Sequence, residues 1–262
     1  MVIGINARSW HPAAAYLYVL NLDGPSVAWE YLRRNADYRQ DCARNKRDSD
    51  YFTERWGLAF PENPDLDSRM VQPVWRSAPD ALVRVMADDD DTGDADPFSL
   101  WAIPGRKSLR HDSRGLLLTA AVGGKVLRMA IATDVCHGGS FAYVIRSGPR
   151  AQAQCKALQE QLARSHATGP VKAGAVTERP RRLAMLHMRA LQALDGLLLG
   201  ASHRDIAIAI FGEGPVAERW HADSELRAQT RHLIHRGQAF VHGEYRSLIT
   251  RATSHKYGDK VH

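Results

Sequence analysis

The side chains best suited to chemistry gather between residues 224 and 246, where arginine, histidine and glutamine recur at regular intervals. Arg227, Arg231 and His235 follow one another every four residues, and Gln238 comes three residues later. On an α-helix this spacing places the four side chains along one row. Guanidinium and imidazole groups bind phosphates, and arginine and glutamine also form paired hydrogen bonds with guanine and adenine edges. The spacing therefore predicts a row of DNA contacts.

Two further arginines extend this candidate surface. Arg236 falls on another face of the same helix, and Arg246 lies beyond the expected end of the helix. We therefore expect these two side chains to bind phosphates rather than base edges. The alternative is a surface that contacts only water, because that is the usual role of the charged side of an amphipathic helix.

Two helices are needed to position this row. Ser202 can cap the first helix, with Asp205 at the third helical position, and apolar residues then recur at helical spacing until Gly212. Gly214-Pro215 reinforces this end. The second helix begins near 223–224 and carries an inner stripe of Leu226, Thr230, Leu233, Gly237 and Phe240. A short apolar helix, a connection and a basic amphipathic helix together predict a helix-turn-helix, with the second helix in the DNA major groove.

An enzymatic alternative also starts from this stretch. His232 and His235 are three residues apart, with His221 and His242 nearby, so a metal-dependent nuclease is conceivable. However, no carboxylate pair or cysteine cluster completes a ligand set, and the spacing differs from the His-Glu-x-x-His motif of zinc proteases. We therefore expect no enzymatic activity, no metal site and no cofactor.

Charge is distributed unevenly along the 262 residues. The net formal charge is −6 over residues 1–100, +7 over 101–167 and +5 over 168–262. A basic second half suits a polyanionic partner such as double-stranded DNA, and an acidic front suits a different task. The three scattered cysteines suggest neither a disulfide framework nor a zinc ribbon. No apolar run approaches the length of a membrane span, so we expect a cytoplasmic protein without membrane contact.

Two breaks divide the chain into three expected domains. The acidic run 87–97 and the Gly/Pro/Ala-rich stretch 167–180 bound a helical front domain at 1–88, a basic β-containing region with a helix at 98–166, and a helix-turn-helix domain at 178–250. Helices are expected over 26–46, 150–164 and 181–200, and strands over 115–122, 126–133 and 140–147, with a further strand at 99–105 and a strand-like tail at 82–85. The fold class is α+β, mainly helical, with a small antiparallel sheet in the middle.

The predicted core has two parts. Trp29 and Leu32 are expected beneath the aromatic residues of 51–60. In the C-terminal domain, the inner stripe is expected to pack beneath Leu194 and Ile206.

Three stretches together resemble a known family. They are WEYLRRNADYR at 29–39, ALDGLLLGASHRDIAIAIFG at 193–212 and RHLIHRGQAFVHGEYRSLI at 231–249. They are similar to proteobacterial transcriptional regulators associated with integrative and conjugative elements, which carry a front domain and a C-terminal variant helix-turn-helix domain. The resemblance covers about 26–60 and 181–250. Residues 235–239, HRGQA, also resemble the promoter-reading RRGRA sequence of sigma factors and differ from it at His235 and Gln238.

This resemblance implies a DNA-binding activator of element excision or conjugative transfer genes. Activation would require a second partner, and an acidic front kept off DNA by like charge suits RNA polymerase or another regulator. A second branch of the family implies the main alternative, in which the same helix pair binds a related regulator and the protein acts as an antiactivator.

Overall fold

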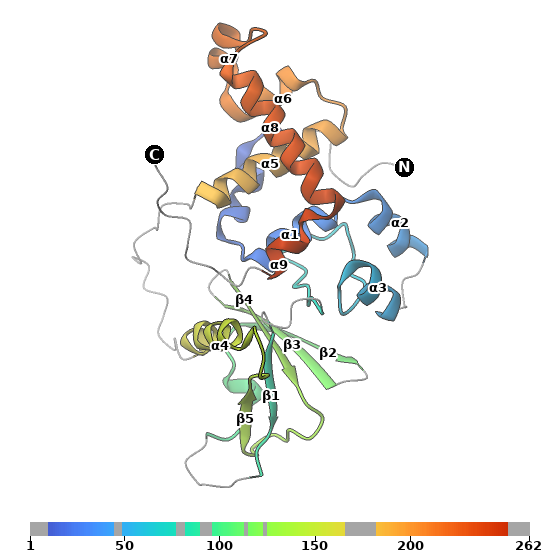
Figure 1. Cartoon of the computed structure of the whole chain (residues 1–262), viewed down its shortest axis with the longest axis vertical. Coiled ribbons are helices and arrows are strands. Elements are labelled where there is room, and N and C mark those ends of the chain that lie inside the picture. Colours follow the sequence, from blue (N-terminus) through green and yellow to red (C-terminus); the bar gives the residue numbers. More distant parts are fainter. Residues whose placement is uncertain are drawn as a thin grey trace. The chain divides into compact units, whose positions relative to one another are not determined.

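The computed structural model describes residues 10–44, 49–76, 82–89, 96–112, 115–122, 125–165 and 182–250. These residues form two compact units, each assembled from separate segments of the chain. Unit 1 comprises residues 1–47, 62–71 and 173–246, and unit 2 comprises residues 48–61, 72–172 and 247–262. The prediction of a mainly helical α+β fold with a small central sheet is confirmed (Figure 1). The division into three continuous domains stays a prediction.

Unit 1 is helical in its described residues. It contains the 3-10 helix η1 (Ala13–Asn21), α1 (Gly24–Leu32), α2 (Ala36–Arg44), α5 (Arg182–Leu198), α6 (His203–Phe211), α7 (Glu213–Arg219), α8 (Glu225–Ala239) and the π-helical turn η4 (Phe240–Glu244). The last described helix, α9 (Arg246–Thr250), begins at the boundary between the units. Figure 1 shows α8, in red, beside α5 and α6.

The first two helices replace one predicted helix. Residues 26–46 read as continuous, but α1 ends at Leu32 and α2 starts at Ala36. The break is stabilised at Asn35, whose Oδ1 accepts a hydrogen bond from the backbone N–H of Tyr38 at 2.9 Å and so caps α2. The prediction that Trp29 and Leu32 are buried is confirmed, since both are 0% exposed. Trp29 packs edge-on against Tyr38 within unit 1, and its Nε1 donates to the carbonyl of Leu66.

Unit 2 is a five-stranded sheet with helical cover. Its elements are α3 (Ser49–Trp56), β1 (Val83–Ala87), the 3-10 helix η3 (Leu100–Ala102), β2 (Arg106–Asp112), β3 (Gly115–Val122), β4 (Lys125–Ile131), β5 (Phe141–Val144) and α4 (Ala151–Ser165). The strand order is β2-β3-β4-β1-β5. The expected strands at 115–122, 126–133 and 140–147 are confirmed as β3, β4 and β5. The segment 99–105 instead contains η3, and the strand that follows starts at Arg106.

The sheet is mixed rather than purely antiparallel. β2, β3 and β4 form an antiparallel meander, whereas β1 pairs in parallel with β4 and antiparallel with β5. The strand-like tail of 82–85 therefore inserts between two strands that come later in the chain. A parallel pair needs a long connection, which the residues between β1 and β4 supply.

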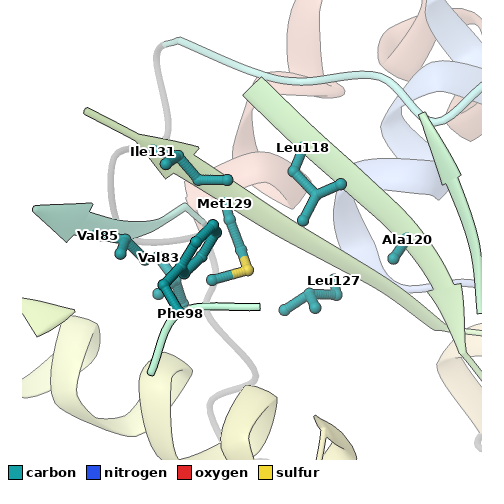
Figure 2. Close-up of a cluster of buried hydrophobic side chains, with 8 residues drawn as sticks. All are labelled: Val83, Val85, Phe98, Leu118, Ala120, Leu127, Met129 and Ile131. Carbon is teal, nitrogen blue, oxygen red and sulfur yellow. The ribbon is translucent and has the colours of Figure 1, made fainter. Parts of the chain in front are cut away.

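Apolar side chains are buried on both faces of the sheet at β3, because successive residues of a strand point to opposite faces. On one face, Figure 2 shows Leu118 and Ala120 gathered with Val83, Val85, Phe98, Leu127, Met129 and Ile131. Leu158 of α4 packs against this cluster, so the expected packing of this helix on the sheet is confirmed. On the other face, Leu117 joins Ala59, Phe60, Val74 and Leu82. No helix in the described residues is long and apolar enough to cross a membrane.

Candidate nucleic-acid interface

The central element of the candidate interface is α8, and its local sequence explains where it starts. Ser224 has extended backbone angles and its side chain accepts a hydrogen bond from the N–H of Arg227 at 3.3 Å, so it caps the helix as its residue type favours. Glu225 in the first turn complements the positive end of the helix dipole. Thr230 donates its hydroxyl to the carbonyl of Leu226 at 2.7 Å, which satisfies a polar group on the buried side.

One face of α8 packs closely on α5. Thr230, Leu233, Ile234 and Gly237 are buried, and Leu226 is half-buried at the start of the helix. A Cβ atom added at Gly237 would lie 2.9 Å from the carbonyl oxygen of Ala190 and 3.0 Å from Cβ of Leu194, both on α5. The absence of a side chain at this position therefore lets the two helices approach. The predicted inner stripe is confirmed, and Leu194, Ile206 and Phe240 are buried as expected.

The opposite face of α8 carries the predicted row. Arg227, Arg231 and His235 are all exposed, and the helix runs without interruption from Glu225 to Ala239. Their four-residue spacing therefore places them on one side of the helix, away from α5. Gln238 is half-buried, and its backbone carbonyl lies 2.7 Å from Nδ1 of His242.

The two remaining predicted residues occupy different surroundings. Arg236 is half-buried, with its guanidinium 4.9 Å from the ring centroid of Phe240, and its Nε atom has no hydrogen-bond partner among the described residues. Arg246 is exposed at the start of α9, with its guanidinium 5.8 Å from the centroid of Tyr245. The structure thus groups Arg227, Arg231 and His235 and sets Arg236 and Arg246 apart from them.

The connection between α6 and α8 differs from the expectation. Gly212 and Gly214-Pro215 were expected to end a helix, and Gly212 does end α6 with a φ of 92°. The short helix α7 starts immediately afterwards, with Pro215 in its first turn, where the missing N–H of proline costs no helical hydrogen bond. Val216 anchors α7 by burial. Three helices therefore stand in sequence where two joined by a simple connection were predicted.

The capping of α6 follows the prediction closely. The Ser202 side chain accepts from the backbone N–H of Asp205, and the Asp205 carboxylate accepts from the backbone N–H of Ser202. This reciprocal capping box fixes the start of α6. The burial of Ile206 and Ala207 then brings α6 against α5, since a Cβ atom added at Gly196 of α5 would lie 3.0 Å from Cγ1 of Ile206.

Further exposed cationic groups lie on these helices and were not singled out from the sequence. They are His203 and Arg204 on α6 and Arg219 on α7. Exposed carboxylates at Glu213 and Glu218 accompany them on α7. The outer face of α8 between residues 227 and 235 carries only basic and neutral groups, so it is the most consistently cationic part of these helices. No periodicity connects Arg204 to Arg219, which is why sequence reasoning missed them.

A buried ion pair joins the front segment to α5, and through α5 supports α8. Arg34 and Asp195 are 5% and 2% exposed, and they pair through two hydrogen bonds of 2.6 and 2.8 Å. Tyr16 also donates to Asp195 at 2.7 Å, and Arg34 contacts Glu30. Burial alone would raise the pKa of the Glu30 carboxyl, but the guanidinium groups of Arg33 and Arg34 lower it to about 2. The Glu30 carboxylate therefore stays ionised inside this network.

A second contact joins the front segment to the end of α8. Asn35 donates from Nδ2 to the carbonyl oxygen of Val241 at 2.9 Å. The ring of Tyr31 stacks on Phe240 with 4.8 Å between centroids, and its hydroxyl lies 3.0 Å from Nδ1 of His187. Burial lowers the pKa of His187 to about 4, and the nearby charge of Arg236 acts in the same direction, so this imidazole is neutral at physiological pH.

The exposed basic groups of α8 are placed to bind an anionic partner. Among the described residues, no group of three or more histidine, cysteine or acidic side chains is placed to hold a metal ion. The buried ionisable side chains of unit 1 bind one another, whereas the exposed basic groups of α8 face outwards. Cations on an outward helix face can contact phosphates and base edges without rearrangement of the fold.

Three segments of the chain match models of known protein families. Residues 9–61 match the model of a proteobacterial transcriptional regulator-like domain, residues 144–250 match the model of a T6SS transcription factor DNA-binding domain, and residues 80–127 match a domain of unknown function (DUF7011). No curated protein matches the chain. The candidate row on α8 and its support on α5 both lie inside the matched DNA-binding segment. With a regulator-like front segment and a DNA-binding C-terminal segment, the chain is similar to DNA-binding transcriptional regulators of proteobacteria, and the matches support that function.

Proposed function

We propose that the chain binds double-stranded DNA through the exposed row of α8 and activates genes for excision or conjugative transfer of a mobile element. The observation that carries the DNA contact is the division of α8 into two faces. One face is packed on α5 through Gly237 and Leu233, and the other presents Arg227, Arg231 and His235 to solvent. In this proposal α6, α7 and α8 form a helix-turn-helix variant, with α8 in the major groove.

The residues of the row have separate roles in this proposal. Arg227 and Arg231 lie in the first two turns of α8, the part of a recognition helix that reaches base edges. His235 and Gln238 continue the same side. Arg236 and Arg246 bind phosphates, and Arg236 also packs on Phe240, so its replacement would disturb the fold as well. Arg246 is therefore the better probe of a phosphate contact.

The test is a titration of single variants on two duplexes. One duplex is selected by the wild-type protein from a random-sequence pool, and the other is a scrambled sequence of the same composition. Arg227→Ala or Arg231→Ala should cost about 1–3 kcal/mol on the selected duplex and little on the scrambled one. Arg246→Ala should weaken binding to both and lower the salt slope by about one unit.

The control variant is Gln229→Ala, which removes an exposed side chain that bonds within its own helix to Glu225. It should bind both duplexes like the wild type. Equal losses on both duplexes for Arg227→Ala and Arg231→Ala would remove these residues from base readout. If neither variant loses affinity for either duplex and the protein binds a related regulator protein, the antiactivator function would replace DNA binding as the proposed function.

We propose that the acidic front contacts RNA polymerase or another regulator rather than DNA. Its exposed carboxylates include Asp37 on α2 and Asp50 and Glu54 on α3, and like charge keeps such groups away from phosphates. Replacing these three residues by lysine should lower transcription from a reporter promoter. Their replacement should leave affinity for the selected duplex unchanged or slightly increased, and a large loss of DNA affinity would count against this assignment.

A further inference from the structure

The end of α8 has an unusual backbone. Instead of stopping at Ala239, the helix widens into the π turn η4, and Gly243 interrupts the turn with a φ of 143°. A π turn changes the pairing of backbone groups, so some carbonyls need other donors. The carbonyl of Val241 is buried and finds such a donor in the Asn35 side chain, 206 residues earlier in the chain.

A single corner of the front segment therefore holds this end of α8. The corner comprises the last turn of α1 and the turn to α2, and it contributes the Tyr31 ring and the Asn35 amide, which contact Phe240 and Val241 respectively. It is itself attached to α5 by the buried pair of Arg34 and Asp195. Hydrogen bond, ring stacking and ion pair act together, so the corner and α5 hold the helix end at a defined position.

We propose that Asn35 is a positioning residue for DNA recognition, which it controls by fixing the direction of α8. This inference rests on the proposed function of the α8 row. Arg227 precedes Val241 by 14 residues, about 21 Å along a helix that rises by about 1.5 Å per residue. A tilt of about 5° about the held end would move Arg227 by about 2 Å, which exceeds the tolerance of a hydrogen bond to a base edge. Contacts to phosphates by a long, mobile side chain tolerate such a shift better.

Asn35 also has a local role that a test must separate from this one. Its Oδ1 caps α2 by accepting from Tyr38 N–H, and loss of that cap alone would lower stability without changing recognition. Serine is an equally good capping residue, but it is too short to donate to Val241. Asn35→Ser therefore retains the cap and removes the contact with η4.

The experiment compares Asn35→Ser with a control that weakens a neighbouring cap. Asp23 caps α1 by accepting from Ser26 N–H, so Asp23→Ala should lower the melting temperature without removing a contact to η4. The probes are a duplex selected by the wild-type protein from a random pool and its scrambled counterpart. For Asn35→Ser we expect Kd on the selected duplex to rise about five- to tenfold, as the weakening of one base contact predicts, with less than about a twofold change on the scrambled duplex.

All binding is measured below the melting temperature of each variant, so that the protein is folded. Phe240→Leu provides a second test variant. It removes the stacking on Tyr31 from the side of η4 and should give the same loss of discrimination. Because Arg236 packs on the same ring, we also expect a loss of affinity that is equal on both duplexes. For Asp23→Ala we expect both Kd values to stay at those of the wild type. Unchanged discrimination in Asn35→Ser and Phe240→Leu, or equal loss of discrimination in Asp23→Ala, would overturn the positioning role. Failure of the wild type to prefer the selected duplex would instead overturn the proposed function.

Discussion

Removing the carboxylate of Asp195 should destabilise unit 1 more than any surface change. The variant Asp195→Ala leaves the buried Arg34 guanidinium with Glu30 as its remaining acidic partner, and it leaves the Tyr16 hydroxyl without its acceptor. Losing one partner of a buried ion pair costs about 3–5 kcal/mol. Such a loss is a large part of the total stability of a typical domain, which is about 5–15 kcal/mol. We therefore expect the variant to be marginally folded.

A double-mutant cycle isolates the contribution of the pair. Arg34→Met leaves Asp195 with the Tyr16 hydroxyl, and the double variant Arg34→Met/Asp195→Ala leaves no unpaired charge between the two positions. We expect the double variant to be more stable than Asp195→Ala and the coupling free energy to be about 2–3 kcal/mol. The exposed pair of Arg39 and Asp65 is the matched control, and Asp65→Ala should cost less than about 1 kcal/mol.

The measurement must report on unit 1 alone, because two units need not unfold together. Native-state hydrogen exchange at the buried amides of Leu191 and Leu194 in α5 meets this need, since their slowest exchange reflects opening of this core. A cost below about 1 kcal/mol for Asp195→Ala, or additive costs in the cycle, would refute the argument that this pair joins the front segment to α5.

Two further predictions concern the packing and the pH dependence of the same unit. Gly237→Ala should lower the melting temperature, because overpacking against Ala190 and Leu194 costs about 1–3 kcal/mol and exceeds the gain of about 1 kcal/mol in helix propensity. The control is Gly214→Ala, because a Cβ atom at this position would meet nothing within 4 Å. A higher melting temperature for Gly237→Ala would show that α5 and α8 are less closely packed. The folded pKa of His187 is about 4 against an ordinary value of 6.5, so protons favour the unfolded chain and stability should fall by up to about 3 kcal/mol as the pH drops from 6.5 to 4. His187→Gln should remove this loss of stability. The Glu30 carboxyl adds a loss of its own only below pH 4.5, because its pKa is lowered from that value in the folded protein. A wild-type stability that is constant between pH 6.5 and 4.5 would contradict the burial of a neutral imidazole.

The features that sequence reasoning predicted well depend on nearby residues. The cap at Ser202, the start of α8 near Ser224, the inner stripe of α8 and the strands β3 and β4 are set by residues a few positions apart. The exposed row on α8 follows from the same periodicity, because a buried face defines an exposed one.

The features that were missed depend on residues far apart in the chain, or on a residue pair that can either end one helix or begin the next. Asn35 and Val241 are separated by 206 positions, so nothing local identifies Asn35 as a partner of η4. The parallel position of β1 likewise depends on strands that follow much later. Gly214-Pro215 reads equally well as the end of α6 and as the first turn of α7, since proline suits both places.

The polar residues of the WEYLRRNADYR stretch at 29–39 have a structural role that the sequence alone did not indicate. Glu30, Arg33 and Arg34 belong to one buried network, and Asn35 reaches η4. These side chains make contacts inside unit 1, so the stretch stabilises the C-terminal helices. Deletion of residues 1–97 should therefore abolish DNA binding, because it would remove Arg34 from beside Asp195.

The discontinuity of unit 1 has a consequence for synthesis of the protein. Residues 10–44 are made first, yet the helices that bury Trp10, Tyr31 and Arg34 are made last, after the whole sheet of unit 2. On the ribosome, the sheet of unit 2 can fold while α1 and α2 still expose the apolar and charged side chains that they bury in unit 1. Such a chain of high contact order folds slowly and exposes aggregation-prone surface, so chaperones gain time to bind it. The chain can complete unit 1 only after α8 and η4 have left the ribosome, so DNA recognition by α8 begins only after the sheet of unit 2 has been made.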